Sequence, residues 1–547
     1  MVYLICDNSV LLQYTVKNFG TAVLQQLVAT IALRNILYKR RWSSEQSAGY
    51  DDGYRRLRRR YLYIEIIRKK VVSLEILYSI IGSINNILWS YVLIFCLVGL
   101  GIYFSLKTGF VQLRMLPDMV AALTEGAKSK VQGKAISPFQ AFCVSTASRV
   151  GVGNIAGVAI AIVTGGPGAV FWMWVIAFFG AATGFVESTL AQIYKLPLKE
   201  GAFHGGPAYY IQNGLGRPKL AKLFALLISV TFGLIYVSVQ ANTIVISAET
   251  AFGIDRLLTA CIVCVLAALV IFGGMNRIAK VAALLVPVMA GLYILSAFVV
   301  VVMHISEVPA MFALIIHDAF SPQAAVGGGF GTAVMTGVKR GLFSNEAGEG
   351  SVPNAAATAA ASHPVKQGLI QALGVYVDTW LVCTATAFII MLNGQYIIGG
   401  ELTGIALAQA SLGNAFGTWA PDFLAGMIFL FAFSSIVGNY YYGEINIAFF
   451  KSSVKRNLLV YRCLLLGMII WGSIAELRLI WDSADLFMGL LSLTNLYAIS
   501  ILGKYVYIAF KDYQLQRAQG IKNPVFDPHI LPDTKGIFAW GMDKERQ

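Results

Sequence analysis

Long apolar segments alternate with short polar connections along most of the chain, beginning at about Ser73. Most segments come close to the roughly 20 residues that an α-helix needs to cross the ~30 Å hydrocarbon core of a bilayer. The pattern therefore predicts an all-α polytopic membrane protein with about eleven transmembrane helices. The expected spans are 84–106, 138–163, 168–194, 221–249, 256–273, 280–303, 330–360, 367–392, 421–450, 457–475 and 486–510.

The order of these spans indicates an internal repeat. After the first span, five spans (138–303) and five more (330–510) each begin with a segment interrupted by glycines and polar residues. An odd number of crossings gives the two halves opposite orientations, as in transporters built from inverted repeats. We therefore expect an inverted 5+5 repeat preceded by one extra helix. A binding site is expected between the two interrupted helices, near the middle of the bilayer.

The domain organisation expected from this pattern has five parts. Residues 1–72 hold thirteen Lys or Arg against five Asp or Glu and are expected to be a basic extension foreign to the core. Binding of anionic lipid or RNA by this arm stays open as an alternative. The other parts are the extra first helix with a cytoplasmic linker (73–137), the first repeat (138–303), an outer loop with the second repeat (304–510), and a cytoplasmic tail (511–547).

Composition supports a membrane protein. The 547 residues are 57% hydrophobic and 13% charged, and the mean hydropathy is +0.68; a soluble protein of this size needs more polar surface. The seven cysteines are scattered. Cys261 and Cys264 form a C-x-x-C inside an apolar run, without a second pair or a nearby histidine, so we expect packing rather than metal or redox chemistry.

The distribution of Lys and Arg predicts the orientation. These residues gather in every second connection, whereas 281–338 and 367–450 contain none. By the positive-inside rule, the C-terminus is expected in the cytoplasm, with the protein in the plasma membrane, the inner membrane of a bacterium. Topology thus accounts for most of the core's positive charge, and no nucleic-acid partner is expected.

In the first interrupted segment, glycines at 151, 153 and 157 surround Asn154. A break there gives the outer half-helix free N–H groups and a partial positive end, which suit a carboxylate. Carbonyls released near Ala147 and Val150 suit a small hard cation such as Na⁺. Close packing of helices through glycine is the alternative interpretation.

The second interrupted segment, 341–361, carries Ser344, Asn345, Glu346 and Glu349. A carboxylate or the carbonyl end of a half-helix at this depth could receive an ammonium group, so the two breaks would match the two poles of an amino acid. Alternatively, Glu346 or Glu349 pairs with Lys339 or Arg340.

Further polar residues lie within other spans, where they are costly in lipid and should face the bundle interior. Glu187 is expected to be a hydrogen-bond partner of a broken helix, and Gln240 to line a pocket; Asp378 is left without a role. Ser434 and Ser435 offer adjacent hydroxyls for a cation, although serines in membrane helices usually bond to the i−4 carbonyl.

These stretches carry a family resemblance. VGVGNIAG with GGPGAVFW downstream, GLFSNEAGEGSVPNAAATA and SSIVGNYYYGE resemble the alanine or glycine:cation symporter family, whose fold is similar to that of the leucine transporter. The resemblance runs from about Ser73 to the C-terminal region. It implies sodium- or proton-coupled uptake of a small neutral amino acid by alternating access.

The resemblance also implies roles for individual residues. Asn154 and the Gly153 backbone would bind the substrate carboxylate, and Gln240 and Ser435 would line the pocket. Sodium would be held by the residues Ala147, Val150, Ser434 and Ser435. Asn439 stands where some family members carry Trp; a smaller polar residue enlarges the pocket, so glutamine joins alanine and glycine as a candidate substrate.

Other classes fit the sequence less well. No H-E-x-x-H, G-x-S-x-G or histidine cluster indicates an enzyme, and no cofactor is expected beyond the co-transported ion. A channel would more naturally show a filter repeat or a ring-forming charged helix. A proton-coupled permease is the main alternative, followed by an ion channel.

Overall fold

The computed structural model describes residues 78–540, apart from 130, 132–133, 322–330, 394–395 and 451–453. The expected basic extension, 1–72, lies outside the described residues. Internal contacts divide the chain into residues 1–80 and 81–547. The architecture below is that of the second unit.

Within the described residues, eight helices are long and apolar enough to cross a membrane. They are Tyr78–Lys107, which includes η1 (Leu88–Leu93) and α4 (Ile94–Lys107); α9 (Gly168–Ile193); Pro218–Phe252, which joins α11 (Pro218–Val230), η4 (Thr231–Tyr236) and α12 (Val237–Phe252); α14 (Met275–Met303); Pro364–Leu392, which joins α19 (Pro364–Val375), η5 (Tyr376–Cys383) and α20 (Thr384–Leu392); α22 (Ala420–Phe449); α23 (Val454–Ile474); and α24 (Leu477–Ala518).

A ninth span is broken. Helix α7 (Pro138–Arg149) is followed, after a short interruption, by η2 (Gly153–Gly157) and α8 (Val158–Gly165), and the two halves are bent by 49°. Ser137 starts α7 with a capping box, in which its hydroxyl accepts from the Gln140 N–H and the Gln140 side chain accepts from the Ser137 N–H.

The expected count of eleven spans is not confirmed. Two of the expected spans fall short of a membrane-spanning helix within the described residues. Helix α13 (Arg256–Ile271) has 16 residues, which reach about 24 Å. The expected span 330–360 is divided into α17 (Thr332–Asn345) and α18 (Val352–Thr358) by the irregular stretch 346–351. Because of its polar residues and glycines, neither piece alone is long or apolar enough to cross the membrane.

Shorter elements connect and cover the spans. The helices are α5 (Val111–Arg114), α6 (Leu116–Lys128), η3 (Lys199–Gly201), α10 (Pro207–Asn213), α15 (Val308–Ala319), α21 (Gly404–Phe416) and η6 (Pro528–Ile530). Two short strands, β1 (Leu196–Pro197) and β2 (Phe203–His204), pair antiparallel, with Leu196 opposite His204.

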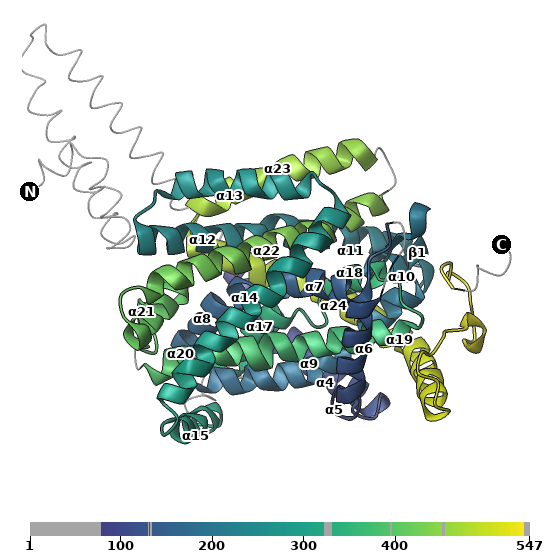
Figure 1. The fold of residues 1–547 in the computed structure, drawn as a ribbon, viewed down its shortest axis with the longest axis horizontal. Coiled ribbons are helices and arrows are strands. Elements are labelled where there is room, and N and C mark those ends of the chain that lie inside the picture. The colour runs from purple at the N-terminus through teal and green to yellow at the C-terminus, as the bar shows by residue number, and fades with distance from the viewer. Residues whose placement is uncertain are drawn as a thin grey trace, which may run out of the picture. The chain divides into compact units, whose positions relative to one another are not determined.

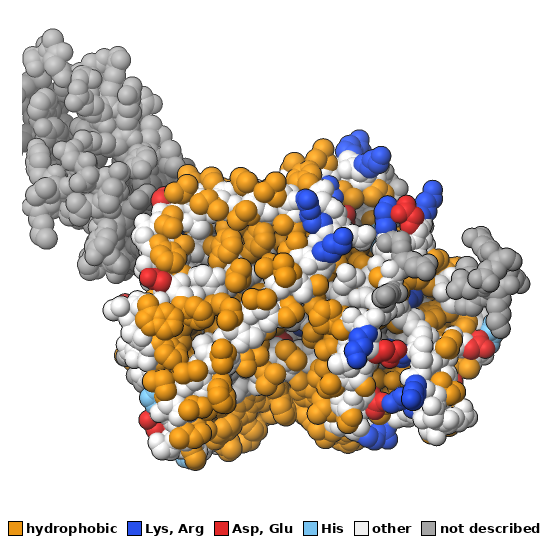
Figure 2. Space-filling view, in the orientation of Figure 1, with side chains coloured by type: hydrophobic (Ala, Val, Ile, Leu, Met, Phe, Trp, Pro, Cys, Tyr) orange, Lys and Arg blue, Asp and Glu red, His pale blue; other side chains and the backbone are white. Residues whose placement is uncertain are grey.

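The outer surface of the bundle is that of a multi-pass membrane protein. Large apolar side chains such as Leu257, Leu284 and Phe298 are exposed. Figure 2 shows apolar side chains over most of the visible face, while Lys and Arg gather towards the end where α6, α10 and β1 lie. The mean hydropathy of the eight long helices is high because their outward sides are apolar too.

The two interrupted helices meet inside the bundle. Helix α17 packs against η2 and α8, and α18 packs against α7. Helix α9 supports the second break through its contacts with α17, α18 and α19, while α22 packs on α7 and α12 (Figure 1). The prediction that two broken segments face each other is therefore confirmed.

Several spans contain a stretch of π-helix, namely η1, η2, η4 and η5. A π-stretch adds a residue to the helical turn and is frequent at functional sites. Asn154 lies in η2, Tyr236 in η4 and Asp378 in η5. These irregular turns place polar side chains between the spans that surround the breaks.

Candidate substrate and sodium site

The first break is built by the residues that follow Arg149. Val150 leaves the helical conformation with ψ 89°, and the Gly151 N–H donates to Asn154 Oδ1 at 2.8 Å. In an unbroken helix this N–H would bond to the carbonyl of Ala147. The Asn154 side chain therefore diverts the N–H and releases the Ala147 carbonyl for another partner.

Side chains of α22 and α12 approach the Gly151 backbone closely. A Cβ at this position would lie 2.2 Å from Ser435 Oγ and 3.1 Å from Gln240 Oε1. Gln240 also accepts from the Val152 N–H at 3.2 Å. The structure thus brings Gln240 and Ser435 to the first break, where sequence reasoning expects them.

The Asn154 side chain links three elements. Its amide nitrogen donates to Ser344 Oγ at 2.8 Å and to Asp378 Oδ1 at 2.6 Å, while its oxygen accepts from Gly151. Ser344 donates to Asp378 Oδ2 at 2.6 Å, and Thr379 adds a hydrogen bond to the same oxygen at 2.9 Å. Asp378, left without a role at the sequence level, thus ties the two breaks to η5.

The second break adopts left-handed backbone conformations. Glu346 has φ 56°, Gly348 φ 98° and Gly350 φ 80°. Glu346 lies between the breaks, because its oxygens accept from Ser148 and Ser351, both at 2.6 Å. The left-handed turn at Glu346 points its carboxyl across to α7 instead of along α17.

Glu187 supports this irregular stretch from α9. Its carboxyl accepts from the Gly348 N–H at 3.2 Å and from Asn495 Nδ2 at 2.7 Å. This confirms the interpretation of Glu187 as a hydrogen-bond partner of a broken helix. Asn345 does not join the group around Asn154: its Oδ1 accepts from the Ala347 N–H at 3.0 Å, near Gly180 of α9.

Ser434 and Ser435 meet the released carbonyl of α7. Ser435 Oγ lies 2.9 Å from the Ala147 oxygen, and Ser434 Oγ lies 3.4 Å from it. Both hydroxyls also lie within 3.0 Å of the Phe431 carbonyl oxygen. Oxygens from two helices therefore converge as hard ligands, which suit Na⁺. Sequence reasoning missed Phe431, although the i−3 and i−4 bonding habit of serines signals it.

Val150 and Gly153 contribute backbone rather than side chains. The Asn154 N–H bonds to the Gly151 carbonyl at 3.3 Å and not to Val150, its helical partner, so the Val150 carbonyl is also released. Gly153 begins η2 beside Phe343. Asn439 reaches the same region, since Ser148 Oγ lies 2.7 Å from its Oδ1.

Arg149 is a further charged residue that sequence reasoning overlooked. It is 2% exposed, and its guanidinium donates to the Gln371 carbonyl and Oε1 at 3.2 and 3.1 Å. A buried cation at membrane depth is itself a signal of a functional interior. Its charge offsets that of the neighbouring buried carboxyls, Glu187, Glu346 and Asp378.

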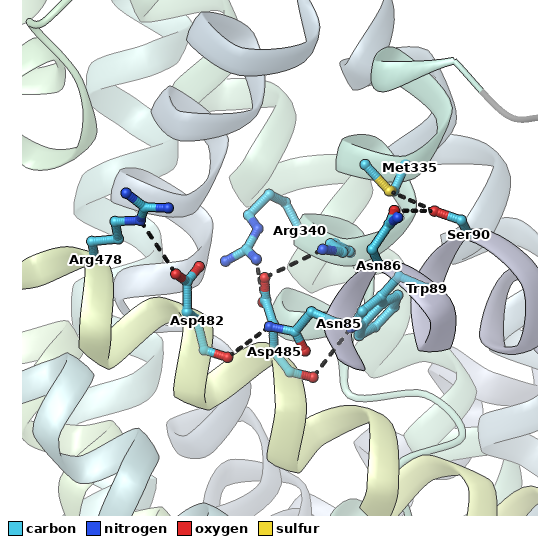
Figure 3. Close-up of polar contacts among 10 residues, drawn as sticks. Asn85, Asn86, Trp89, Ser90, Met335, Arg340, Arg478, Asp482 and Asp485 are labelled. Carbon is cyan, nitrogen blue, oxygen red and sulfur yellow. Dashed lines mark hydrogen bonds and ion pairs between the residues drawn. The ribbon is translucent and has the colours of Figure 1, made fainter. Parts of the chain in front are cut away.

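An ion pair closes one side of this site. Arg340 of α17 contacts the Asp485 carboxylate of α24 (Figure 3). Lys339 Nζ lies 3.7 Å from Asp485 Oδ2. The interpretation that Arg340 or Lys339 pairs with Glu346 or Glu349 is therefore wrong: both cations pair with Asp485 of α24.

The first helix strengthens this closure. Trp89 donates its indole N–H to the Asp485 carbonyl at 3.2 Å, and Asn85 donates to the Asp482 carbonyl at 2.9 Å (Figure 3). Asp482 also lies 3.5 Å from Arg478. Three segments distant in sequence thus meet at the start of α24.

Aromatic rings continue the closure towards the breaks. The Arg340 guanidinium lies 4.7 Å from the Trp481 ring, a cation–π contact. Phe343 packs between Trp481 and Tyr236, with centroid distances of 4.8 and 4.7 Å. All the predicted site residues are buried, so the structure describes a closed arrangement.

Two facing discontinuous helices that hold polar groups inside a membrane bundle define the class of secondary transporters. The comparison with known families makes this specific: the sodium:alanine symporter family matches residues 74–528. The chain belongs to this family. The expectation of a symporter family rather than an enzyme is thereby confirmed.

Named relatives are similar over most of their length. The chain is 53% identical to the probable sodium/glutamine symporter GlnT of Bacillus subtilis, covering 85% of this chain and 96% of the relative. It is 49% identical to the amino-acid carrier protein AlsT of the same species, covering 85% and 98%. The sodium/alanine symporter AgcS of Methanococcus maripaludis is 36% identical, covering 81% and 99%.

Proposed function

We propose that this protein takes up a small neutral amino acid together with Na⁺ by alternating access, with alanine, glycine and glutamine as the candidate substrates. The observation that carries the proposal is the first break, which releases the Ala147 carbonyl beside Ser434 and Ser435 and faces the second break. The names of GlnT and AgcS support sodium as the coupling ion and glutamine and alanine as substrates.

In the proposed mechanism, Na⁺ binds first to oxygens of α7 and α22. Its ligands would be the carbonyls of Ala147, Val150 and Phe431 and the hydroxyls of Ser434 and Ser435. The cation adds positive charge in a site of low dielectric, so it favours binding of the substrate carboxylate and couples the two events. It also holds α7 against α22, which favours closure.

The amino acid would then bind across the breaks. Its carboxylate would meet the N–H groups at Gly153 and the Asn154 amide, with Gln240 and Ser435 beside it. Its ammonium would face the second break, at Ser344. The contact of Asn345 with substrate stays a prediction. Its side-chain oxygen already accepts a hydrogen bond from the Ala347 N–H within the second break.

The orientation is also part of the proposal. The end that carries α6, α10 and β1 would face the cytoplasm together with the C-terminus, and Arg340 and Asp485 would lie on the outer side, in the bacterial inner membrane. The Arg340–Asp485 pair would then close the outer path and separate before substrate enters. The Lys and Arg side chains that gather at that end (Figure 2) support this assignment.

Uptake into proteoliposomes tests the proposal. Radiolabelled alanine, glycine or glutamine should accumulate above its external concentration when an inward Na⁺ gradient is imposed. Collapse of that gradient by a sodium ionophore should remove the accumulation. Accumulation that follows a proton gradient instead would show that H⁺ is the coupling ion. Uptake that does not depend on any cation gradient would refute symport.

A further inference from the structure

The chain folds back onto the bundle after α24. The segment 519–540, yellow in Figure 1, lies at the end of the molecule that carries α10 and β1. Phe526 and Leu531 in this segment are only 4% and 5% exposed, so the segment packs on the bundle instead of extending into solvent. We call residues 519–540 the strap.

One attachment of the strap is the connection between α18 and α19, which follows the second break. The Phe526 N–H donates to the Ser362 carbonyl at 3.0 Å, and the Ser362 hydroxyl donates to Asn523 Oδ1 at 2.8 Å. The Phe526 ring packs on the His363 ring, with centroids 5.3 Å apart. Lys366, at the start of α19, also contacts the Asn523 side chain. Backbone, side-chain and ring contacts thus hold the strap on this connection.

The other attachment is the end of α9. The Trp540 indole N–H donates to the Gln192 carbonyl at 2.9 Å, and the Trp540 ring centroid lies 4.6 Å from Lys195 Nζ, a cation–π contact. Lys195 Nζ and Gln192 Nε2 donate in turn to the Ala359 carbonyl at 3.0 and 2.9 Å. The strap therefore contacts the two residues that satisfy the free carbonyl end of α18.

The end of α18 closes the site on this side of the breaks. Tyr441 of α22 donates its hydroxyl to Thr358 Oγ1 at 2.9 Å. Asn446 of α22 donates to Asn354 Oδ1 at 2.9 Å, and all four side chains are buried. Opening of the breaks towards this end requires α18 to move away from α22, which breaks both hydrogen bonds.

The strap joins helices on both sides of this closure. Its attachments at Ser362 and Gln192 belong to the side formed by α9, α18 and α19, which pack together. On the other side, a Cβ at Gly536 would lie 3.0 Å from Asn213 Cβ at the end of α10, and α10 packs on α22 and α24. Separation of α18 from α22 would therefore pull the strap away from one of its two sides.

We propose that the strap holds the site closed towards the face that carries the C-terminus, and that its contacts must release before the site opens there. This inference rests on the proposed function, because it assigns the strap to one step of alternating access. The strap contacts none of the residues assigned to the substrate or to Na⁺. Its effect would therefore arise from the equilibrium between the closed and open states.

Labelling of Cys383 tests the proposal, because its thiol is buried and lies 3.0 Å from Ser344 Oγ, between the breaks. Trp540→Ala removes a hydrogen bond and a cation–π contact from the strap. In a protein whose other cysteines are replaced, an impermeant thiol reagent should then label Cys383 at least about fivefold faster from the face that carries the C-terminus. Labelling from the opposite face should not rise. Protease access to a C-terminal tag identifies the face in sealed vesicles.

Two control variants accompany this measurement. Trp540→Phe keeps a ring beside Lys195 and should label more slowly than Trp540→Ala. Trp419→Ala removes a tryptophan at the start of α22 that is 57% exposed, and labelling should stay unchanged. Unchanged labelling in Trp540→Ala would overturn the proposal. An equal rise from both faces would also overturn it, because it would indicate general loosening of the fold.

A reversible cross-link tests whether release of the strap is required. In a protein whose native cysteines are replaced, Ser362→Cys with Asn523→Cys places two thiols where the native side chains are in contact. A short reagent with two methanethiosulfonate groups should lower sodium-driven uptake at least about tenfold, and a reductant should restore it. The control pair, Gln516→Cys with Val525→Cys, ties the strap only to its own helix, α24, and should leave uptake unchanged.

The outcomes separate this inference from the proposed function. Full uptake by protein that is cross-linked between positions 362 and 523 would overturn the role of the strap alone. Absence of sodium-driven uptake by the unaltered protein would refute the proposed function. Labelling of Cys383 needs no transport, so it tests the strap in either case.

Discussion

Mutation of Ser435 tests the proposed sodium site most directly. Ser435→Ala removes one of the oxygens that converge at the first break. Because Ser434 Oγ also lies near the Ala147 and Phe431 carbonyls, at 3.4 and 2.8 Å, neither carbonyl loses its only nearby hydroxyl. We therefore expect folding to change by no more than about 1 kcal/mol.

The effect on sodium should be larger. An oxygen that contacts a full charge contributes about 1.5–3 kcal/mol, so the Na⁺ concentration for half-maximal uptake should rise roughly 10- to 150-fold. The maximal uptake at saturating Na⁺ should change much less. This expectation follows because the variant removes one oxygen ligand of Na⁺ and leaves both halves of the broken helix unchanged.

The assay is initial uptake of radiolabelled glutamine into proteoliposomes over a series of Na⁺ concentrations at constant ionic strength. Ser473→Ala is the matched control, because it removes another buried serine hydroxyl that bonds to the i−4 carbonyl. The reasoning is refuted if Ser435→Ala shows the same Na⁺ dependence as the unaltered protein while the amino-acid KM rises.

Three further predictions follow from the closure, the pocket and the cytoplasmic end. Asp485→Asn removes the carboxylate that pairs with Arg340, and loss of one member of a buried ion pair costs about 3–5 kcal/mol. The outer side of the protein should therefore open more often. In a protein whose other cysteines are replaced, an impermeant thiol reagent should label the buried Cys383 at least about tenfold faster. Asn439→Trp should fill the space beside the substrate and reduce uptake of glutamine before that of alanine or glycine, as measured by kcat/KM for each. Burial lowers the pKa of Lys195 from 10.5 to about 7, so between these pH values the unfolded chain holds a proton that the folded protein lacks. The free energy of unfolding should therefore rise in this range by up to about 1.4 kcal/mol per pH unit. Tm measured from pH 7 to 9 should rise less in Lys195→Met than in the unaltered protein.

Each of these predictions has a contradicting result. Unchanged labelling of Cys383 in Asp485→Asn, with Asp422→Asn as the control, would show that the ion pair does not hold the outer side closed. Unchanged glutamine uptake in Asn439→Trp would remove Asn439 from the pocket. An equal pH slope for Lys195→Met and for the exposed-lysine control Lys199→Met would contradict the burial argument.

The apolar pattern predicted the main features of the fold because each interrupted span is visible locally. Glycines around Asn154, and glutamates beside Gly348 and Gly350, mark backbone that cannot stay helical in lipid. The count of eleven spans was not confirmed where helix length decides: α13 has 16 residues, and the second break divides its span into two pieces.

The contacts within the site were only partly predictable. Ser434 and Ser435 are neighbours in the sequence, so their hydroxyls could be assigned together. The partner of Arg340 could not be found this way, because Asp485 lies 145 positions away and no spacing rule connects them. Arg149 escaped notice because a single cation near the end of a half-helix resembles a topological signal.

Equilibrium binding of labelled glutamine to the purified protein in Na⁺ and in K⁺ tests the central claim most directly. Because the cation and the amino acid are expected to bind at one pair of breaks, glutamine affinity should rise steeply with Na⁺, and glutamine should tighten Na⁺ binding by the same factor. Equal glutamine affinity in Na⁺ and K⁺ would contradict a shared site.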